Sequence, residues 1–200
     1  KMIIAIDPGH GGKDPGTAGK NILEKHLVLK IAKRLVSLIN AEKNMTAFLT
    51  RDGDYFPCPQ NKKSCDQITS LNERLDKAKR AGAVLFISIH ADSFRDPRVR
   101  GATVYALSDT DKIPKDGEWL AMYHVKRYSK AAVQLSGGTA NEVTAYDQSL
   151  VVGDAVIKEL KKVTRMRKLS VRQAAFVVLK SNEMASILIE TSYLSNPGDE

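Results

Sequence analysis

Short apolar, β-branched runs alternate along this chain with segments of helical periodicity. The runs suited to strands are residues 2–6, 46–50, 84–89, 102–106, 176–179 and 186–190. The segments with helical spacing are residues 23–40, 71–81, 118–135 and 150–163. Because alternating strands and helices pack as a sheet covered by helices, we predict an α/β three-layer sandwich. Its core is a mostly parallel, twisted sheet of about six strands flanked by helices.

Two stretches interrupt the alternation. Residues 52–69 are rich in Pro, Asn, Lys and Ser, and residues 107–149 form a long, turn-rich connection. Connections of this length inside a compact domain are more often functional than idle. We therefore predict a single catalytic domain over residues 1–200, with residues 107–149 as a candidate regulatory or gating insertion.

A histidine follows each of two predicted strands. Residues 2–6 lead into a turn that carries His10, and residues 84–89 lead directly into His90. In open α/β sheets, ligands bind beyond the carboxyl ends of the strands. Two imidazoles delivered to that edge predict a metal site.

A carboxylate is expected as the third protein ligand. Zinc hydrolases commonly use two histidines and a carboxylate and keep one position for water. Glu24 is the candidate, because it opens the helix after the glycine-rich residues 11–17, which can fold back toward His10. The alternative is an ordinary acid in a first helical turn, where the helix dipole favours negative charge.

Glu190 is the candidate catalytic group. It ends the apolar run of residues 187–189 and is expected at the same edge of the sheet. Apolar walls disfavour the charged form of a carboxylate, whereas a nearby metal ion favours it. Such a glutamate can take a proton from water and return it to a leaving amine. The alternative is a strand-end acid that reaches solvent.

Other histidines and acids are assigned lesser roles. We interpret His26 and His124 as surface or packing residues, because His26 lies on another helix face than the candidate ligand and His124 has no clear partner. Asp7 and Asp92 are candidates for the carboxylates that hydrogen-bond the free ring nitrogens of the ligating histidines. Asp7 is equally explained as the turn residue before a proline.

Composition and net charge limit the kinds of partner that the chain is expected to bind. Hydrophobic residues make up 42% of the 200 residues, and no apolar run approaches the roughly 20 residues that span a bilayer, so we do not expect a membrane-embedded protein. The net charge of +8 favours an anionic partner. Because basic and aromatic residues are not interleaved, we do not expect nucleic acid. Acidic cell-surface polymers or an acidic protein fit the net charge as well as nucleic acid does.

Cys58 and Cys65 are the two cysteines of the chain. A disulfide that closes a surface loop is the simpler interpretation, and it implies an oxidising compartment. The alternative is two unpaired thiols in a cytosolic loop. A structural zinc site would need four ligands and usually has tighter cysteine spacing.

Several short motifs occur together, in one order, from one end of the chain to the other. They are Ile6-Asp7-Pro8-Gly9-His10-Gly11-Gly12, Asp14-Pro15-Gly16, Glu24-Lys25, Leu49-Thr50-Arg51, Leu71 with Arg74, residues 86–92, and Ile189-Glu190 with Ser195-Asn196-Pro197. With these motifs the sequence resembles the zinc-dependent N-acetylmuramoyl-L-alanine amidases of the amidase-3 family, the bacterial cell-separation type. The joint match is far more specific than any single His or Glu.

The resemblance implies roles for four residues and a reaction. By it, His10, Glu24 and His90 bind Zn²⁺ and Glu190 is the catalytic carboxylate. The family hydrolyses the amide bond between N-acetylmuramic acid and the L-alanine of peptidoglycan stem peptides, in cell-wall remodelling and daughter-cell separation. Such enzymes work in the periplasm or elsewhere outside the cytoplasmic membrane. Since the chain opens directly on a strand, we expect an export signal upstream of it.

The resemblance also implies regulation through residues 107–149. In septal family members, a helix in this region covers the active site until a divisome-linked activator draws it away. An activator of this kind is therefore an expected partner beside peptidoglycan. Glu118 or Glu142 could fill an open zinc position in a closed state, and the alternative for each is an ordinary surface acid.

Two other functions compete with this one. Another zinc amide hydrolase, of the carboxypeptidase or deacetylase type, could use a related scaffold, so fold alone does not decide. A cation placed to bind a free carboxylate terminus would discriminate in favour of a carboxypeptidase, and the sequence does not identify one. A non-catalytic wall-binding module predicts loss of a metal or acid position, but all four are present.

Overall fold

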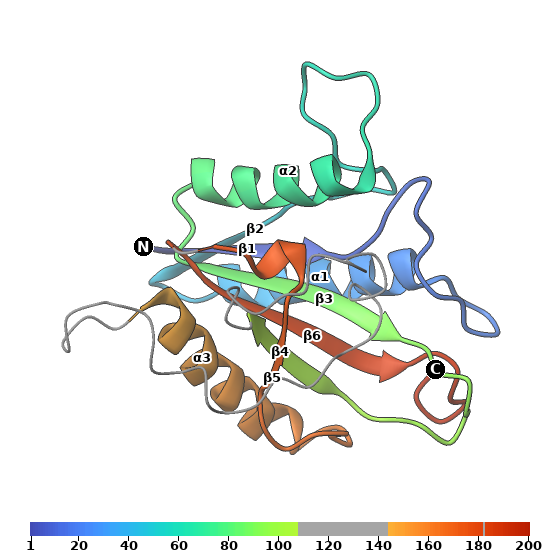
Figure 1. Cartoon of the computed structure of the whole chain (residues 1–200). Helices are drawn as coiled ribbons and strands as arrows, with labels where there is room; N and C mark the ends of the chain where they lie inside the picture. Colours follow the sequence, from blue (N-terminus) through green and yellow to red (C-terminus); the bar gives the residue numbers. More distant parts are fainter. Residues whose placement is uncertain (108–143, 182) are drawn as a thin grey trace.

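The computed structural model describes residues 1–107, 144–181 and 183–200 (Figure 1). Within these ranges the strands are β1 (Met2–Pro8), β2 (Met45–Leu49), β3 (Leu85–Asp92), β4 (Thr103–Leu107), β5 (Arg172–Ala174) and β6 (Ala185–Tyr193). The helices are α1 (Glu24–Asn40), α2 (Gln67–Arg80), α3 (Ala145–Leu160) and the short 3₁₀ helix η4 (Val177–Leu179). The strands form one sheet in the order β2-β1-β3-β6-β4-β5.

The sheet is mixed rather than purely parallel. Neighbours β2, β1, β3 and β6 are parallel, and β5 is parallel to β4. Only β4 and β6 pair antiparallel among the described strands. Parallel neighbours need a long crossover, usually a helix, whereas β4 follows β3 through residues 93–102 with no helix between them, which allows it to run back. The predicted α/β sandwich with a mostly parallel sheet is confirmed.

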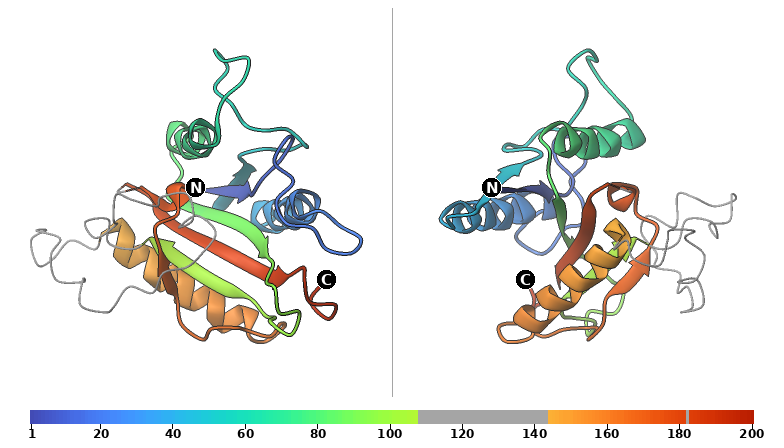
Figure 2. Two further views of the ribbon diagram at one scale, coloured as in Figure 1. Left: turned by 45° about the vertical axis from the view of Figure 1, so that its right-hand side comes forward. Right: turned by 90° about the vertical axis from the view of Figure 1, so that its left-hand side faces the viewer.

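Helices cover both faces of the sheet (Figure 1, Figure 2). On one face, Val28 of α1 and Ile157 of α3 pack on apolar side chains of the central strands. On the other, Leu75 of α2 and Leu179 of η4 join a second apolar cluster. Since successive strand residues point to opposite faces, the buried runs of β1, β3 and β6 supply both clusters. These three central strands are therefore held rigidly, and their carboxyl ends are well-defined attachment points.

Two predicted helices begin earlier than their periodicity indicated. Asp66 caps α2, and its carboxylate accepts a hydrogen bond from the Thr69 N–H at 2.8 Å. For α3, Thr144 and Asp147 bond reciprocally as a capping box. Caps satisfy N–H groups that the helix leaves free, so each helix extends back to its cap. The predicted helix at residues 118–135 lies outside the described residues.

The strand predicted at residues 176–179 is wrong. Val177–Leu179 forms η4, and its side chains pack onto the sheet instead of pairing with it. The strand at that edge is β5, just before it, with the polar sequence Arg-Gln-Ala. A short apolar run buried on a sheet and one buried within it have the same sequence pattern.

Cys58 and Cys65 are joined by a disulfide, as predicted, so the alternative of two free thiols is wrong. None of the helices in the described ranges has the length and apolar character that crossing a membrane requires.

Buried charge fixes the carboxyl end of β1. The Asp7 carboxylate accepts hydrogen bonds from Arg74 Nη1 and Ser88 Oγ, both at 2.8 Å, and from the Thr50 hydroxyl. Burial would raise the pKa of Asp7, but the charge of Arg74 and these hydrogen bonds outweigh it and hold the pKa below 3.8. Asp7 and Arg74 thus form an ionised pair that joins β1 to α2, and the Ser88 hydrogen bond ties β3 to the same carboxylate.

We predict that Asp7→Asn lowers the free energy of unfolding near neutral pH by about 3 kcal/mol, because Arg74 then keeps a buried charge without its partner. The folded-state pKa of Asp7 is depressed, so its carboxylate stabilises the fold above its unfolded pKa of about 4 and loses that effect as the pH falls below it. Urea titrations should give a constant difference between wild type and Asp7→Asn from about pH 7 to pH 5 and a shrinking one below about pH 4.

Asp96→Asn is the control for that experiment. Asp96 forms an exposed ion pair with Arg98 at 2.8 Å, and exposed pairs of this kind contribute little to stability. The urea midpoint of Asp96→Asn should match that of the wild type. An Asp7→Asn protein as stable as wild type near neutral pH would contradict the assigned role of the buried pair.

Candidate metal centre

Two buried arginines shape the loop that carries His10. Arg51 donates to the carbonyl oxygens of Pro8 at 3.0 Å and Gly9 at 2.6 Å. Arg74 donates to the carbonyls of Pro8 at 2.8 Å and His10 at 2.7 Å. His10 itself has a φ of 59°, a left-handed conformation that costs a non-glycine residue free energy. The arginines hold the backbone in this turn, which sets the direction of the imidazole.

The third strand brings His90 against this loop. β1 and β3 are parallel neighbours, and the Gly9 N–H continues their ladder by donating to the Ile89 carbonyl at 3.0 Å. The His90 ring occupies the space beside Gly9: a Cβ at position 9 would lie 2.2 Å from its Cε1 atom. A glycine is therefore required at position 9 for the two histidines to approach.

Glu24 reaches the same point from the start of α1. The loop before it folds back, and the Glu24 N–H donates to the Thr17 carbonyl at 2.9 Å. The carboxylate is buried, and Oε2 accepts from the Thr17 N–H at 2.8 Å while Oε1 accepts from the Ala91 N–H at 3.0 Å. Backbone donors from two segments thus hold a charge that burial alone would disfavour.

The three predicted ligands meet at one point. Oε1 of Glu24 lies 3.0 Å from Nε2 of His10 and 3.0 Å from Nδ1 of His90. One donor atom from each of the three residues lies within 4.8 Å of the others. Two imidazole nitrogens and one carboxylate oxygen are the donor set of many zinc hydrolases. The residues therefore fit a zinc ion by their chemistry and their convergence.

Asp14 is the carboxylate next to His10, in the place that was predicted for Asp7 or Asp92. Its Oδ2 lies 2.9 Å from Nδ1 of His10. Burial by itself would lower the pKa of His10, but Asp14 and Glu24 outweigh it and raise this pKa from 6.5 to about 9. In turn the pKa of Asp14 is lowered to about 2, against the effect of its own burial. A carboxylate that binds the second ring nitrogen orients a metal-ligating histidine.

The carboxylates predicted for this role lie elsewhere. Asp7 binds Thr50, Arg74 and Ser88, so its assignment to a histidine ring is wrong. Asp92 accepts from the Ser93 N–H at 2.7 Å and interacts with Tyr193 rather than with an imidazole. The sequence signal for Asp14 was its place four residues after His10 within a glycine-rich turn.

Glu190 lies beside His90 on the neighbouring strand. The two residues are register partners in the parallel pair of β3 and β6. Glu190 lines a cavity of about 250 Å³ together with His10, Glu24 and His90. Its Oε2 atom is fully covered and has no hydrogen-bond partner among the described residues. Burial, followed by the negative charges of Asp92 and Glu24, raises the pKa of Glu190 well above 4.5.

The remaining histidines take no described part in this centre. His26 is exposed on α1, in agreement with its interpretation as a surface residue. His124, Glu118 and Glu142 lie outside the described residues, as does most of the predicted insertion at residues 107–149.

Comparisons with known proteins agree with this geometry. The family profile Amidase_3, described as N-acetylmuramoyl-L-alanine amidase, matches residues 4–200. The chain is 38% identical over 208 residues to N-acetylmuramoyl-L-alanine amidase AmiC of Escherichia coli, covering 100% of this chain and 47% of AmiC. It is 35% identical over 215 residues to AmiA of Escherichia coli, covering 100% of this chain and 68% of AmiA.

A solved structure is similar along nearly the whole chain. The N-acetylmuramoyl-L-alanine amidase AmiC2 of Nostoc punctiforme superimposes with a TM-score of 0.63 at 28% identity, covering 99% of this chain and 83% of that one. This chain spans about half the length of AmiC, so it corresponds to a part of that relative. The profile match and the identities of 35% and 38% show that the chain belongs to the N-acetylmuramoyl-L-alanine amidase family, Amidase_3.

Proposed function

We propose that this chain is a zinc hydrolase that cleaves the amide bond between N-acetylmuramic acid and the L-alanine of peptidoglycan stem peptides. The observation that carries the proposal is the convergence of His10, Glu24 and His90, with their donor atoms within 4.8 Å, in one cavity with Glu190. The family supports the substrate, since the relatives are named for this bond. The assignment includes a role in cell-wall remodelling and daughter-cell separation.

The chain's own residues divide into a holding set and a reacting group. His10, Glu24 and His90 would hold the zinc ion, and Asp14 and the two backbone N–H groups on Glu24 would fix the directions of these ligands. When bound, zinc polarises the amide carbonyl and acidifies water.

Glu190 is proposed to move the proton. Its carboxylate, which lines the cavity, would accept a proton from the attacking water and return it to the nitrogen of the departing L-alanine. The raised pKa of Glu190 suits a group that must hold a proton between these two events. Glu24, by contrast, has its pKa lowered by its two histidines, which outweigh the effect of burial, and it stays an anionic ligand.

The charges that line the cavity argue against the carboxypeptidase alternative. Among the described residues that line it, the only Lys or Arg is Arg74. Its Nη1 and Nη2 atoms already donate to Asp7 and to backbone carbonyls, and its Nε, which has no partner among the described residues, is fully covered. A peptide carboxylate would therefore find no free cation on the described walls, whereas an internal amide needs none.

The proposed function includes a location outside the cytoplasmic membrane and regulation by a protein activator. The Cys58–Cys65 disulfide supports an extracytoplasmic, periplasmic location, because such bonds persist in oxidising compartments. We also propose that residues 1–200 act as one catalytic domain, and that a protein activator acts on residues 107–149.

Digestion of purified peptidoglycan tests the reaction itself. We predict that the zinc-loaded protein releases intact stem peptides and leaves unbroken glycan strands, because the amide to the lactyl group is the only bond cut. Chromatography and mass spectrometry of the products check this. Fragments cut within the peptides or between sugars would overturn the assignment.

Glu190→Gln tests the proton-transfer role. The isosteric amide cannot accept the proton, so we expect turnover to fall by about 10²–10⁴-fold while zinc content stays unchanged. Glu159→Gln is the matched control, because Glu159 is exposed on α3 and pairs only with Lys162 among the described residues. Normal turnover in Glu190→Gln would remove this residue from the mechanism.

His90→Ala tests the ligand set. Loss of a ligand should weaken zinc binding by more than the roughly 10–100-fold caused by losing a ligand's hydrogen-bond partner. Elemental analysis after dialysis measures the retained metal. His26→Ala is the control, since this histidine is exposed on α1, and it should retain zinc as wild type does. Equal zinc content in both variants would contradict the site.

A further inference from the structure

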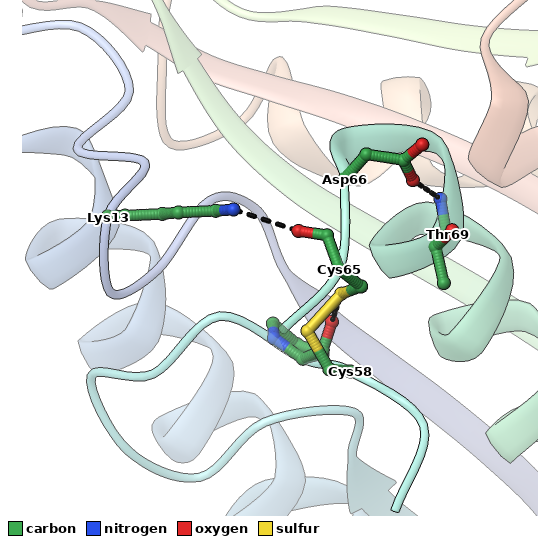
Figure 3. The surroundings of a disulfide bond; sticks show 6 residues. Lys13, Cys58, Cys65, Asp66 and Thr69 are labelled. Atoms are coloured by element: carbon green, nitrogen blue, oxygen red, sulfur yellow. Dashed lines mark hydrogen bonds between the residues drawn. A yellow bond between two sulfur atoms is a disulfide. The ribbon is translucent and has the colours of Figure 1, made fainter. Parts of the chain in front are cut away.

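The disulfide closes a segment that lies against the loop of the first predicted ligand. We call residues 53–66 the cysteine segment. Cys58 and Cys65 are bonded within it, and Asp66 at its end caps α2 (Figure 3). The segment is thus tied at both ends, because Arg51 Nη1 also donates to the Gly53 carbonyl at 2.9 Å. The function proposed above gives the cysteine segment no role.

Asp54 links the segments that carry two of the predicted ligands. Its Oδ1 accepts from the Gly12 N–H at 2.7 Å, two residues after His10. Its Oδ2 accepts from Lys25 Nζ at 2.8 Å, one residue after Glu24. Lys25 Nζ also donates to the Gly12 carbonyl at 3.0 Å. A single carboxylate therefore joins the His10 loop to the start of α1.

The disulfide-closed part of the segment makes a second attachment. Lys13 Nζ donates to the carbonyl oxygen of Cys65 at 2.8 Å, as Figure 3 shows. The same ammonium lies 4.5 Å from the centroid of the Phe56 ring, a distance at which cation–π attraction operates. Lys13 thus contacts both sides of the disulfide loop, and the contact needs Phe56 and Cys65 to remain near each other.

The approach of the two segments is also close at the backbone. Gly12 has a φ of 55°, and a Cβ there would lie 2.7 Å from the Phe56 nitrogen. The His10 loop and the cysteine segment are therefore in direct main-chain contact. A change in the path of the segment at Phe56 would displace Gly12 or separate the two.

We propose that the cysteine segment, held in shape by the Cys58–Cys65 disulfide, is a positioning element for the His10 and Glu24 ligands. Asp54 and Lys13 transmit its position to the two ligand-bearing segments. This inference rests on the proposed zinc centre. It assigns the disulfide a role in metal affinity, in addition to any effect on global stability.

The test is zinc affinity without substrate, measured on the 200-residue chain by competition with a chromophoric chelator. We expect Asp54→Ala to weaken zinc binding by about tenfold, within the range known for groups that orient metal ligands. The double variant Cys58→Ser/Cys65→Ser should weaken it by a similar factor. Combining all three substitutions should cost less than the product of the two factors, because both act through the same segment.

Two controls separate positioning from general destabilisation. Asp96→Ala removes an exposed carboxylate with its own arginine partner in another loop and should keep wild-type zinc affinity. Urea midpoints of all variants are measured in parallel. Asp54 is exposed, so Asp54→Ala should lower zinc affinity with its midpoint close to wild type.

The possible results distinguish this inference from the proposed function. Zinc affinities of Asp54→Ala and the cysteine variant within about twofold of wild type would overturn it and leave the amidase assignment intact. Affinity losses that only follow the urea midpoints would overturn it as well. A wild-type chain that binds no zinc would overturn both. Weakened zinc binding in the variants would support the inference even if the wild-type chain released no stem peptides, a result that would overturn the amidase assignment alone.

Discussion

The centre depends on two guanidinium groups buried beneath the turn after β1. Arg51 and Arg74 bind consecutive carbonyls of that turn, and Arg51 also binds the Lys25 carbonyl at 2.9 Å, next to Glu24. Burial of a cation is costly unless it is well bonded, and here the bonding partners are the backbone segments that carry the histidine and the glutamate. The positive φ of His10 is maintained by the same bonds. The same hydrogen bonds therefore satisfy the buried charges of the two arginines and fix the positions of His10 and Glu24.

Glu24, which is buried, and Glu190, which is half-buried, acquire opposite chemistry from their neighbours. Glu24 faces two imidazoles and two N–H groups, which favour its anion. Glu190 has an oxygen without a partner among the described residues, and burial together with Asp92 and Glu24 raises its pKa. Environments that push the pKa values of paired acids apart are a common way to separate a fixed ligand from a proton carrier. The sheet achieves this by placing Glu190 on β6 and Glu24 on a helix outside the sheet.

Sequence alone was sufficient for the residues whose position follows from an element's end. His10 follows β1, and His90 and Glu190 lie near the carboxyl ends of β3 and β6. Glu24 starts α1, so the convergence of the four residues could be expected from topology. Asp14 could not be found this way, because its contact with His10 depends on a left-handed backbone inside an irregular loop. The polar edge strand β5 was hidden by the apolar run after it, since burial beside a sheet and burial within it give one pattern.

The packing of His90 against Gly9 has a consequence for genetics. Residue 9 carries no side chain and offers nothing to a metal ion, yet any larger residue there would collide with the imidazole of the third strand. A random mutagenesis screen for inactive enzymes should therefore recover changes at this position as well as at the histidines. Such alleles would be mistaken for folding defects unless both stability and metal content were measured, because a displaced ring reduces metal binding in a protein that still folds.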